Sequence, residues 1–232
     1  MTFLELVQEL ARQSGTLAGG TTLSSVASVT GRADKLVTWI KNAWEDIQNQ
    51  RSDWLWMNDT FSGSVLLNTL RYTPTALSQT RVRKWSIDDA SGWQPLTLYD
   101  PALGQTDEGP LHFIPWSLWR TKYDRGSHDA SRPVEYSISP AGELCVGPKP
   151  DQTYTVRGEY WKSPQTLSAN SDEPECPSHL HKIIVWRAMM LMANGDESMA
   201  TYQFARPEYL RLFSVMCSEQ LPAMSASPGA LA

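Results

Sequence analysis

The stretch VTWIKNAWEDIQNQRSDWLWM, residues 37–57, holds four of the ten tryptophans of this 232-residue chain and predicts where its parts meet. Apolar side chains recur in it at i, i+3, i+4 and i+7, the spacing that places them on one face of a helix. Trp39 and Trp44 belong to this stripe, whereas the charged residues fall mostly on the opposite face. We therefore expect an amphipathic helix over about 32–50, with both indoles in the core of a helical bundle.

The same stretch continues past the end of that helix. The run Arg51-Ser52-Asp53 marks the helix end, and Trp54 and Trp56 come directly after it. An enzyme pocket, a sugar-binding platform or a joint between two segments would each explain two large indoles here. The hydrophobic period changes after this point, which favours the joint. Buried indoles remove a large apolar area from water, so they would fix the angle between the helical part and the next part of the chain.

The two ends of the chain carry further helical patterns. Thr2 and Glu5 fit a capping box that would start a helix at 3–13, because each side chain can satisfy a backbone donor of the first turn. The small, polar, glycine-bearing segment 14–31 is typical of a loop that is mobile unless a neighbour orders it.

The C-terminal part returns to helical spacing. A dense apolar set at 177–195 lies between a proline and a glycine, which are helix start and stop signals. A second helical region is expected at about 197–220, where Pro207 either kinks the helix or starts a new segment. The last residues, 221–232, are small and uncharged and should form a tail.

The middle of the chain has the two-residue period of β-strands. Apolar and polar residues alternate at 134–138 and 154–160, with proline- and glycine-bearing turns between these runs. Weaker strand candidates lie at 62–72, 94–99 and 111–123, and Pro115 makes the last of these an edge or a broken strand. This part is therefore expected to be antiparallel and β-rich.

These patterns predict an α+β fold, in which N- and C-terminal helices form one bundle around an inserted antiparallel β-rich region. No end of the chain has enough helices to cover its own apolar stripe, so the two ends are expected to pack together. The expected parts are bundle helices at 1–58, the β-rich insertion at 59–168, bundle helices at 169–220 and a tail at 221–232.

Composition and charge narrow the classes of function. The formal net charge of −5 argues against a protein that grips nucleic acid by its phosphates. No apolar run is long enough for a membrane span, and the N-terminus lacks the pattern of a signal peptide. Cys145, Cys176 and Cys217 are odd in number and widely spaced. Neither a disulfide framework nor a zinc site is expected, and a reducing compartment is the default.

No catalytic, cofactor-binding or metal site is predicted. His179 and His181 are two residues apart, which is poor ligand geometry on a helix, so a solvated or capping role is expected. The acidic pairs are interpreted as a solvated surface rather than as a glycosidase site. They are Asp88-Asp89, Asp107-Glu108, Asp172-Glu173 and Asp196-Glu197.

The tryptophans are the main candidates for a special role. Trp186 lies on an apolar helix face and is expected in the core, like Trp39 and Trp44. The tryptophans of the β-rich part can be core residues or can stack on sugars or bases. They are Trp85, Trp93, Trp116, Trp119 and Trp161. The predicted structural residues are Trp39, Trp44, Trp54, Trp56, Trp161 and Trp186.

Several short segments, taken in chain order, form one shared pattern. The shared pattern begins with WIKNAWEDIQNQRSDWLWM, a helix with Ile-Gln near its end and an Asp-Trp-x-Trp pair after it. It continues with PKPDQTYTVRGEYWKSPQTL, a turn and a strand that ends in Tyr-Trp-x-x-Pro, and with the proline-started helix in ECPSHLHKIIVWRAMMLMA. This pattern resembles the adaptor proteins of tailed bacteriophages. The resemblance covers most of the chain, whereas the segment from about 62 to 130 matches nothing in the pattern.

The resemblance implies a structural protein of the virion, made in the host cytoplasm and placed at the head–tail junction. Such adaptors form dodecameric rings that attach to the portal protein, extend its DNA channel and carry the tail or nozzle proteins. They have a bundle built from both chain ends with a β-rich insertion, and no catalysis or membrane is involved. Twelve copies would bring a formal charge of about −60, and an acidic wall lets genomic DNA pass without specific binding.

Two other classes of function stay open at this point. A tail-associated carbohydrate-binding module would use the tryptophans of the β-rich part, but it would not usually need amphipathic helices at both chain ends. An enzyme would need a carboxylate site that the sequence does not reveal, since no nucleophile constellation is present.

Overall fold

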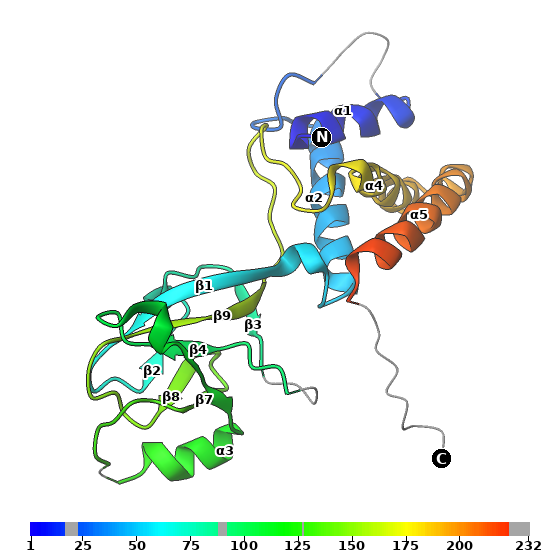
Figure 1. Cartoon of the computed structure of the whole chain (residues 1–232). Helices are drawn as coiled ribbons and strands as arrows, with labels where there is room; N and C mark the ends of the chain where they lie inside the picture. The colour runs from blue at the N-terminus through cyan, green and yellow to red at the C-terminus, as the bar shows by residue number, and fades with distance from the viewer. Residues whose placement is uncertain (17–22, 88–91, 127, 223–232) are drawn as a thin grey trace, which may run out of the picture. The chain divides into compact units, whose positions relative to one another are not determined.

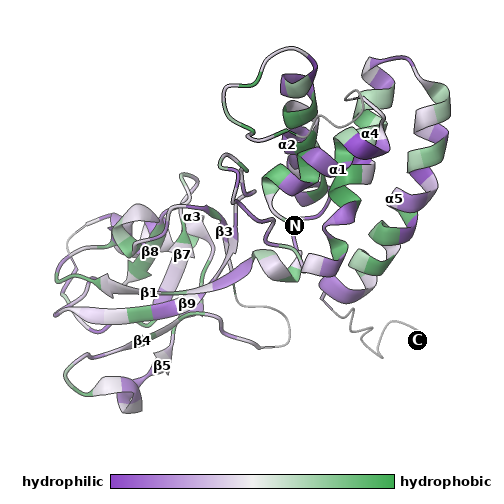
Figure 2. Ribbon diagram, turned by 90° about the horizontal axis from the view of Figure 1, so that it is seen from above, coloured by the Kyte–Doolittle hydropathy of each residue, from purple (hydrophilic) through white to green (hydrophobic). Residues whose placement is uncertain are grey.

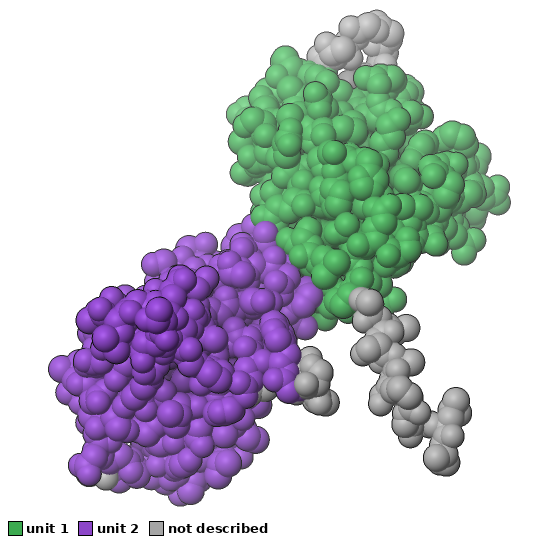
Figure 3. All heavy atoms as spheres, viewed as in Figure 1, with its two compact units in different colours: residues 1–57, 164–232 green, residues 58–163 purple. Residues whose placement is uncertain are grey.

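The computed structural model describes residues 1–16, 23–87, 92–126 and 128–222 (Figure 1). The chain divides into two compact units, which are coloured separately in Figure 3. Unit 1 comprises residues 1–57 and 164–232 and is helical, whereas unit 2 comprises residues 58–163 and holds the strands. Helices from both chain ends with a β-rich middle confirm the predicted α+β class.

Unit 1 contains four long helices and two short 3-10 turns among its described residues. The capping box is present, since Glu5 donates its backbone N–H to Thr2 Oγ1 and accepts the Thr2 N–H at 2.9 Å. The elements are α1 (Phe3–Gln13), α2 (Arg32–Gln50), η1 (Leu55–Met57), η5 (Ser178–Leu180), α4 (Lys182–Gly195) and α5 (Met199–Gln220). The predicted bounds of the first two helices are confirmed.

Helix α4 is the centre of the bundle, because it packs against α1, α2 and α5. Eight of its fourteen residues are buried, as expected of a helix covered on several sides. Helix α5 buries only Ala205, Tyr209 and Met216 and runs unbroken through Pro207. Figure 2 shows hydrophobic and hydrophilic residues interspersed along α5. This helix therefore covers α4 with one face and leaves much of its surface exposed.

The described part of the loop before α2 is held by neighbouring segments. Val26 is buried, and its N–H donates to Asn170 Oδ1 at 2.8 Å. Gln8 on α1 donates to the carbonyl oxygen of Leu23 at 2.7 Å. The sequence predicts mobility for this loop unless a neighbour orders it, and α1 and Asn170 supply such neighbours at residues 23 and 26. Residues 17–22 lie outside the described part.

Unit 2 has two small sheets. The first has the order β1-β9-β4-β5, with β3 also paired to β9, and the second has the order β2-β8-β7-β6. All pairs are antiparallel except β6 with β7. The strands are β1 (Asn58–Val65), β2 (Arg71–Tyr72), β3 (Val82–Trp85), β4 (Thr97–Tyr99), β5 (Gly109–Pro110), β6 (His112–Phe113), β7 (Glu135–Ile138), β8 (Leu144–Gly147) and β9 (Tyr154–Lys162).

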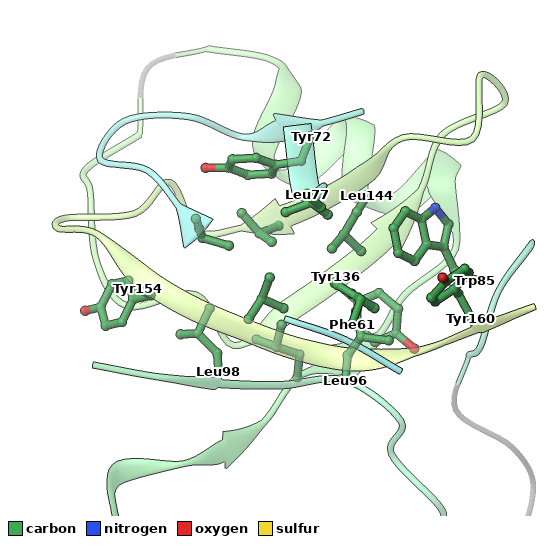
Figure 4. Close-up of a cluster of buried hydrophobic side chains, with 14 residues drawn as sticks. Phe61, Tyr72, Leu77, Trp85, Leu96, Leu98, Tyr136, Leu144, Tyr154 and Tyr160 are labelled. Atoms are coloured by element: carbon green, nitrogen blue, oxygen red, sulfur yellow. The ribbon is translucent and has the colours of Figure 1, made fainter. Parts of the chain in front are cut away.

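The core of unit 2 is formed by side chains from both sheets. Phe61, Trp85 and Tyr160 meet at one end of it, with ring centroids 4.9 to 6.2 Å apart (Figure 4). Gly158 is required beside them, because an added Cβ would come within 2.9 Å of Leu96 and Phe61. The strand β9, which carries the predicted Tyr-Trp pair, pairs with β1, β3 and β4 and is therefore the central strand of its sheet.

One predicted strand is wrong. Residues 111–123 form only the two-residue strand β6, followed by the helical turns α3 (Trp116–Trp119) and η4 (Arg120–Asp124). Pro115 lies just before α3, a place where a proline is tolerated because its missing N–H is not needed there. Two further 3-10 turns, η2 (Thr75–Leu77) and η3 (Gly104–Asp107), connect strands of unit 2.

Candidate functional site

A cluster of aromatic rings occupies unit 1 where α2 ends. Trp56 stacks on Trp54 with ring centroids 4.6 Å apart, and on Trp44 at 6.5 Å. Phe213 of α5 meets Trp54 edge-on at 6.0 Å and stacks on Tyr209 at 5.6 Å. Such stacked and edge-on pairs stabilise a core beyond the apolar area that they bury. The two indoles after the helix thus bind the end of α2 to α5.

The indole nitrogens of the buried Trp44 and Trp54 are both hydrogen-bonded. Trp54 Nε1 donates to the carbonyl oxygen of Ile47 at 3.1 Å, and Trp44 Nε1 donates to Gln165 Oε1 at 3.1 Å. Trp54 is fully buried and Trp44 is 1% exposed. Trp54 therefore has its described contacts within unit 1, and its predicted role in setting the angle to the β-rich part stays a prediction.

Gln48 joins α2 to the segment that returns from unit 2. Its side chain is fully buried. Gln48 Oε1 accepts the N–H of Gln165 at 2.7 Å, and Gln48 Nε2 donates to the carbonyl oxygen of the same residue at 3.0 Å. One side-chain amide thus satisfies both backbone groups of Gln165, as a neighbouring strand would. Gln48 is the glutamine of the Ile-Gln pair near the helix end in the sequence pattern. Its bonds to Gln165 are not predicted by the sequence.

Polar side chains also connect α2 to the two C-terminal helices. Arg187 of α4 pairs with Asp46 of α2 through two hydrogen bonds, one of them 2.9 Å long. The amide of Gln50, also on α2, exchanges hydrogen bonds of 2.7 and 3.0 Å with the hydroxyl of Tyr209 on α5. Because these bonds are directional, they specify how the helices are paired, in addition to the apolar packing.

Two of the tryptophans expected in the core are only half-buried. Trp39 lies under the guanidinium of Arg32, which is 4.8 Å from the ring centroid, and Trp186 meets Phe204 edge-on at 5.8 Å. The prediction that both lie in the core is therefore wrong. The physical reason is that each indole lies at the border of the apolar stripe of its helix. Their predicted structural role, like that of Trp56, remains a prediction.

The tryptophans of unit 2 differ in their surroundings. Trp85 and Trp119 are buried, and their indoles donate to the carbonyl oxygens of Gly142 and Val146 at 2.8 and 3.1 Å. Trp93 is 45% exposed. Trp161 is half-buried and carries the ammonium of Lys84 at 5.0 Å from its ring centroid. Trp116 is half-buried and stacks on Trp119.

One histidine and two cysteines are buried among the described residues, whereas His179 is exposed. His181 is 2% exposed, with Nε2 donating to the carbonyl oxygen of Cys176 at 3.0 Å, so the expectation of a solvated or capping role is wrong for it. Burial lowers the pKa of His181 and raises the pKa of both Cys145 and Cys176 to about 12. These thiols stay protonated and are poor nucleophiles.

Three of the four acidic pairs contain a described carboxylate with a structural partner. Arg132 binds both carboxylate oxygens of Asp107 at 2.8 Å and holds the pKa of Asp107 below its ordinary value. Asp172 accepts the N–H groups of Ser168 and Ala169 in a turn. Asp196 pairs with Arg32, and Asp88-Asp89 lies outside the described residues. Within the described ranges no three His, Cys, Asp or Glu side chains are grouped to hold a metal ion.

The contacts described above stabilise the architecture of the chain, and among the described residues they outline a structural protein rather than a metal site. A protein-family model described as SU10 adaptor protein matches residues 1–228. The chain therefore belongs to the SU10 adaptor protein family and is a bacteriophage head-to-tail adaptor, a structural component of the virion. No curated protein matches the chain. No helix in the described ranges is both long and apolar enough to cross a membrane.

Proposed function

We propose that this chain is the repeating subunit of a head-to-tail adaptor ring. Twelve copies would attach to the portal protein, extend its DNA channel and carry the tail or nozzle proteins. Membership of the SU10 adaptor protein family is the observation that carries this proposal. The role is structural throughout, with no catalytic step, no cofactor and no membrane contact.

The exposed apolar side chains support contacts between neighbouring copies. A closed ring needs heterologous contacts, in which two different patches of the same chain meet. Unit 1 exposes Met199, Phe204 and Leu210 along α5, at 66%, 59% and 49%. Unit 2 exposes a second set that includes Leu66 and Leu118. Large apolar and aromatic side chains are enriched at protein interfaces, so these sets are the candidates for the two patches.

The distribution of charge supports a channel that does not retain DNA. Unit 1 carries 9 Lys and Arg against 13 Asp and Glu, whereas unit 2 carries 11 against 12. The acidic surplus therefore belongs mainly to the helical unit. Where acidic side chains face a channel, they repel the phosphates of DNA, and the genome can slide through without specific binding.

The mass of the complex with portal tests the proposal. Purified chain would be mixed with portal rings of the same phage and measured by native mass spectrometry and negative-stain microscopy. We expect twelve copies per portal ring and an added ring in end-on views, with the portal alone as the control. A chain that stays monomeric beside saturating portal rings would overturn the proposal, whereas a monomer without portal is compatible with assembly on a template.

A carbohydrate-binding module is the second candidate, because Trp85, Trp93 and Trp161 line one groove of unit 2. Aromatic faces can stack on sugar rings. A glycan array probed with the full chain would test this candidate.

A further inference from the structure

A groove of about 800 Å³ lies in unit 2 beside the edge strand β3. Its walls are largely apolar and aromatic, and include Trp85, Trp93, Phe113 and Trp161. Trp93 and Ile87, both in its lining, are each 45% exposed. A groove with exposed aromatic walls is the usual setting for a bound ligand or peptide.

A buried hydroxyl without a partner also lines this groove. Ser86 is 6% exposed, and its Oγ has no hydrogen-bond partner among the described residues. The backbone of Ser86 is satisfied, since its N–H donates to the carbonyl oxygen of Glu159 at 3.0 Å. This oxygen exposes almost no surface, so a ligand in the groove does not reach it, and the binding surface consists of the aromatic walls and the rim.

The rim of the groove is basic. Arg83 and Lys84 line it and are exposed, and neither has a carboxylate partner among the described residues. The ammonium of Lys84 lies over Trp161. A ligand with a carboxylate would therefore be favoured over a neutral or basic ligand.

The edge of β3 is not built to accept a further flat strand. Its register with β9 shifts between Val82 and Lys84, and the two basic side chains occupy this stretch. Bulges and charged side chains are the devices that block strand pairing at a sheet edge. A ligand in extended β conformation would leave backbone groups unpaired there, which disfavours it.

A neutral sugar also fits poorly. Sugar hydroxyls need hydrogen-bond partners when they are desolvated. The described side chains that line the groove include one hydroxyl and two cations, but no carboxylate and no carboxamide. The aromatic walls alone would satisfy the faces of a sugar ring but not its hydroxyls.

We propose that this groove binds a proline-bearing, acidic peptide segment of a partner protein in polyproline II conformation. Such a segment makes no internal hydrogen bonds, and its prolines lack the N–H groups that the edge of β3 would leave unpaired. Proline rings pack on exposed indoles, as in other aromatic-lined grooves. A peptide carboxylate pairs with Arg83 and Lys84 at the rim. The site lies within unit 2, so it does not depend on ring formation.

Two displayed libraries of dodecapeptides would test the proposal with the full chain as bait. One library fixes prolines at Pro-x-x-Pro spacing, and the other fixes β-branched residues at alternate positions. We expect enrichment from the proline library only, with Asp or Glu in the selected peptides. Enrichment from the strand library alone, from neither library, or binding confined to a glycan array would overturn the proposal.

Variants of the chain then locate the binding site. The selected peptide, measured by isothermal titration calorimetry, should lose affinity about tenfold or more with Trp93→Ala and with the double variant R83E/K84E. The matched control R125E/K149E reverses the charge of two basic residues that do not line the groove. It should change the affinity less than about twofold. Equal affinity for the wild type and R83E/K84E, with both folded by circular dichroism, would contradict the assigned site.

Discussion

The side chain of Gln48 and the backbone of Gln165 form a closed pair of hydrogen bonds, 2.7 and 3.0 Å long, across 117 residues of sequence. Gln48 Nε2 also donates to the carbonyl oxygen of Trp44 at 3.2 Å. The oxygen of the Gln165 side chain accepts the indole N–H of Trp44 at 3.1 Å. The point where the chain re-enters the bundle is therefore fixed by directional bonds to α2, next to the stacked indoles.

Replacing Gln48 by leucine should destabilise unit 1 by about 2–4 kcal/mol. The N–H and the carbonyl of Gln165 would both lose their partner, and an unsatisfied buried group costs about 1–3 kcal/mol. Urea unfolding followed by the helical circular dichroism signal would measure the loss. Gln48→Glu keeps the acceptor but loses the donor, so it should also destabilise. A leucine variant as stable as the wild type would show that water replaces the amide.

This joint shows what the sequence could and could not predict. Helix α2 was predictable, because a local apolar stripe and a clear polar end define it. The burial of Gln48 was not, since a glutamine on a helix carries no local sign of a partner 117 residues away. The burial of Trp39 is mispredicted for a related reason: helical spacing gives the direction of a side chain but not how far the neighbouring helices extend over it.

Replacing Trp54 by alanine should destabilise unit 1 by about 3–5 kcal/mol, the usual loss for a buried aromatic side chain. The ring is fully buried and stacks on Trp56, and its N–H is bonded to Ile47. Trp54→Phe keeps a ring but loses that bond, and should cost about 1–2 kcal/mol. Urea unfolding of the wild type, Trp54→Phe and Trp54→Ala would show whether stability falls in that order. A loss below about 1 kcal/mol for the alanine variant would contradict burial.

The stability of the chain should fall below pH 6.5 because of His181. Burial lowers the pKa of His181 from its ordinary 6.5, so the folded chain holds the ring neutral where the unfolded chain protonates it. The stabilisation is complete above pH 6.5 and is lost as the pH falls toward the lowered pKa.

Urea midpoints at pH 7.5, 6.5 and 5.5 would measure this effect. His181→Gln does not titrate and should flatten the decline, relative to the wild type. His179→Gln is the matched control, because His179 is exposed and pairs with Glu219 at 2.8 Å. An equal decline in the wild type and His181→Gln would exclude His181 as the cause.

The three cysteines should differ in their reactivity toward iodoacetamide. Cys145 and Cys176 are buried, and burial raises the pKa of each thiol to about 12. Cys217 on α5 is only half-buried, although burial raises its pKa as well. Native protein at pH 8 should therefore be alkylated first at Cys217, and at the other two only after unfolding. Peptide mass mapping gives the order, and Cys217→Ser should abolish the native labelling.

The two units differ in how much of their structure the sequence predicts. The long strand β9 has a clear alternation around Val156 and Tyr160, and its prediction is confirmed. The strands β2, β5 and β6 have two residues each, too few for a period to appear. The groove beside β3 is also hidden from the sequence, because Trp85, Phe113 and Trp161 come from separate strands and meet only after both sheets have formed.

Removal of residues 221–232 should weaken attachment to the portal while leaving the monomer folded. Of this segment, residues 223–232 lie outside the described part of the chain, and the helix α5 ends before it, at Gln220. The segment is small and uncharged, and it could dock on the portal or on a neighbouring subunit by adding a strand.

Co-sedimentation of truncated and full-length chain with portal rings would measure the effect. We expect at least a tenfold loss of bound chain, with an unchanged urea midpoint for the isolated monomer, because the truncation leaves all the helices of the bundle intact up to Gln220. A scrambled sequence in place of residues 221–232 is the matched control for length. Normal attachment by the truncated chain would show that the tail is not the docking element.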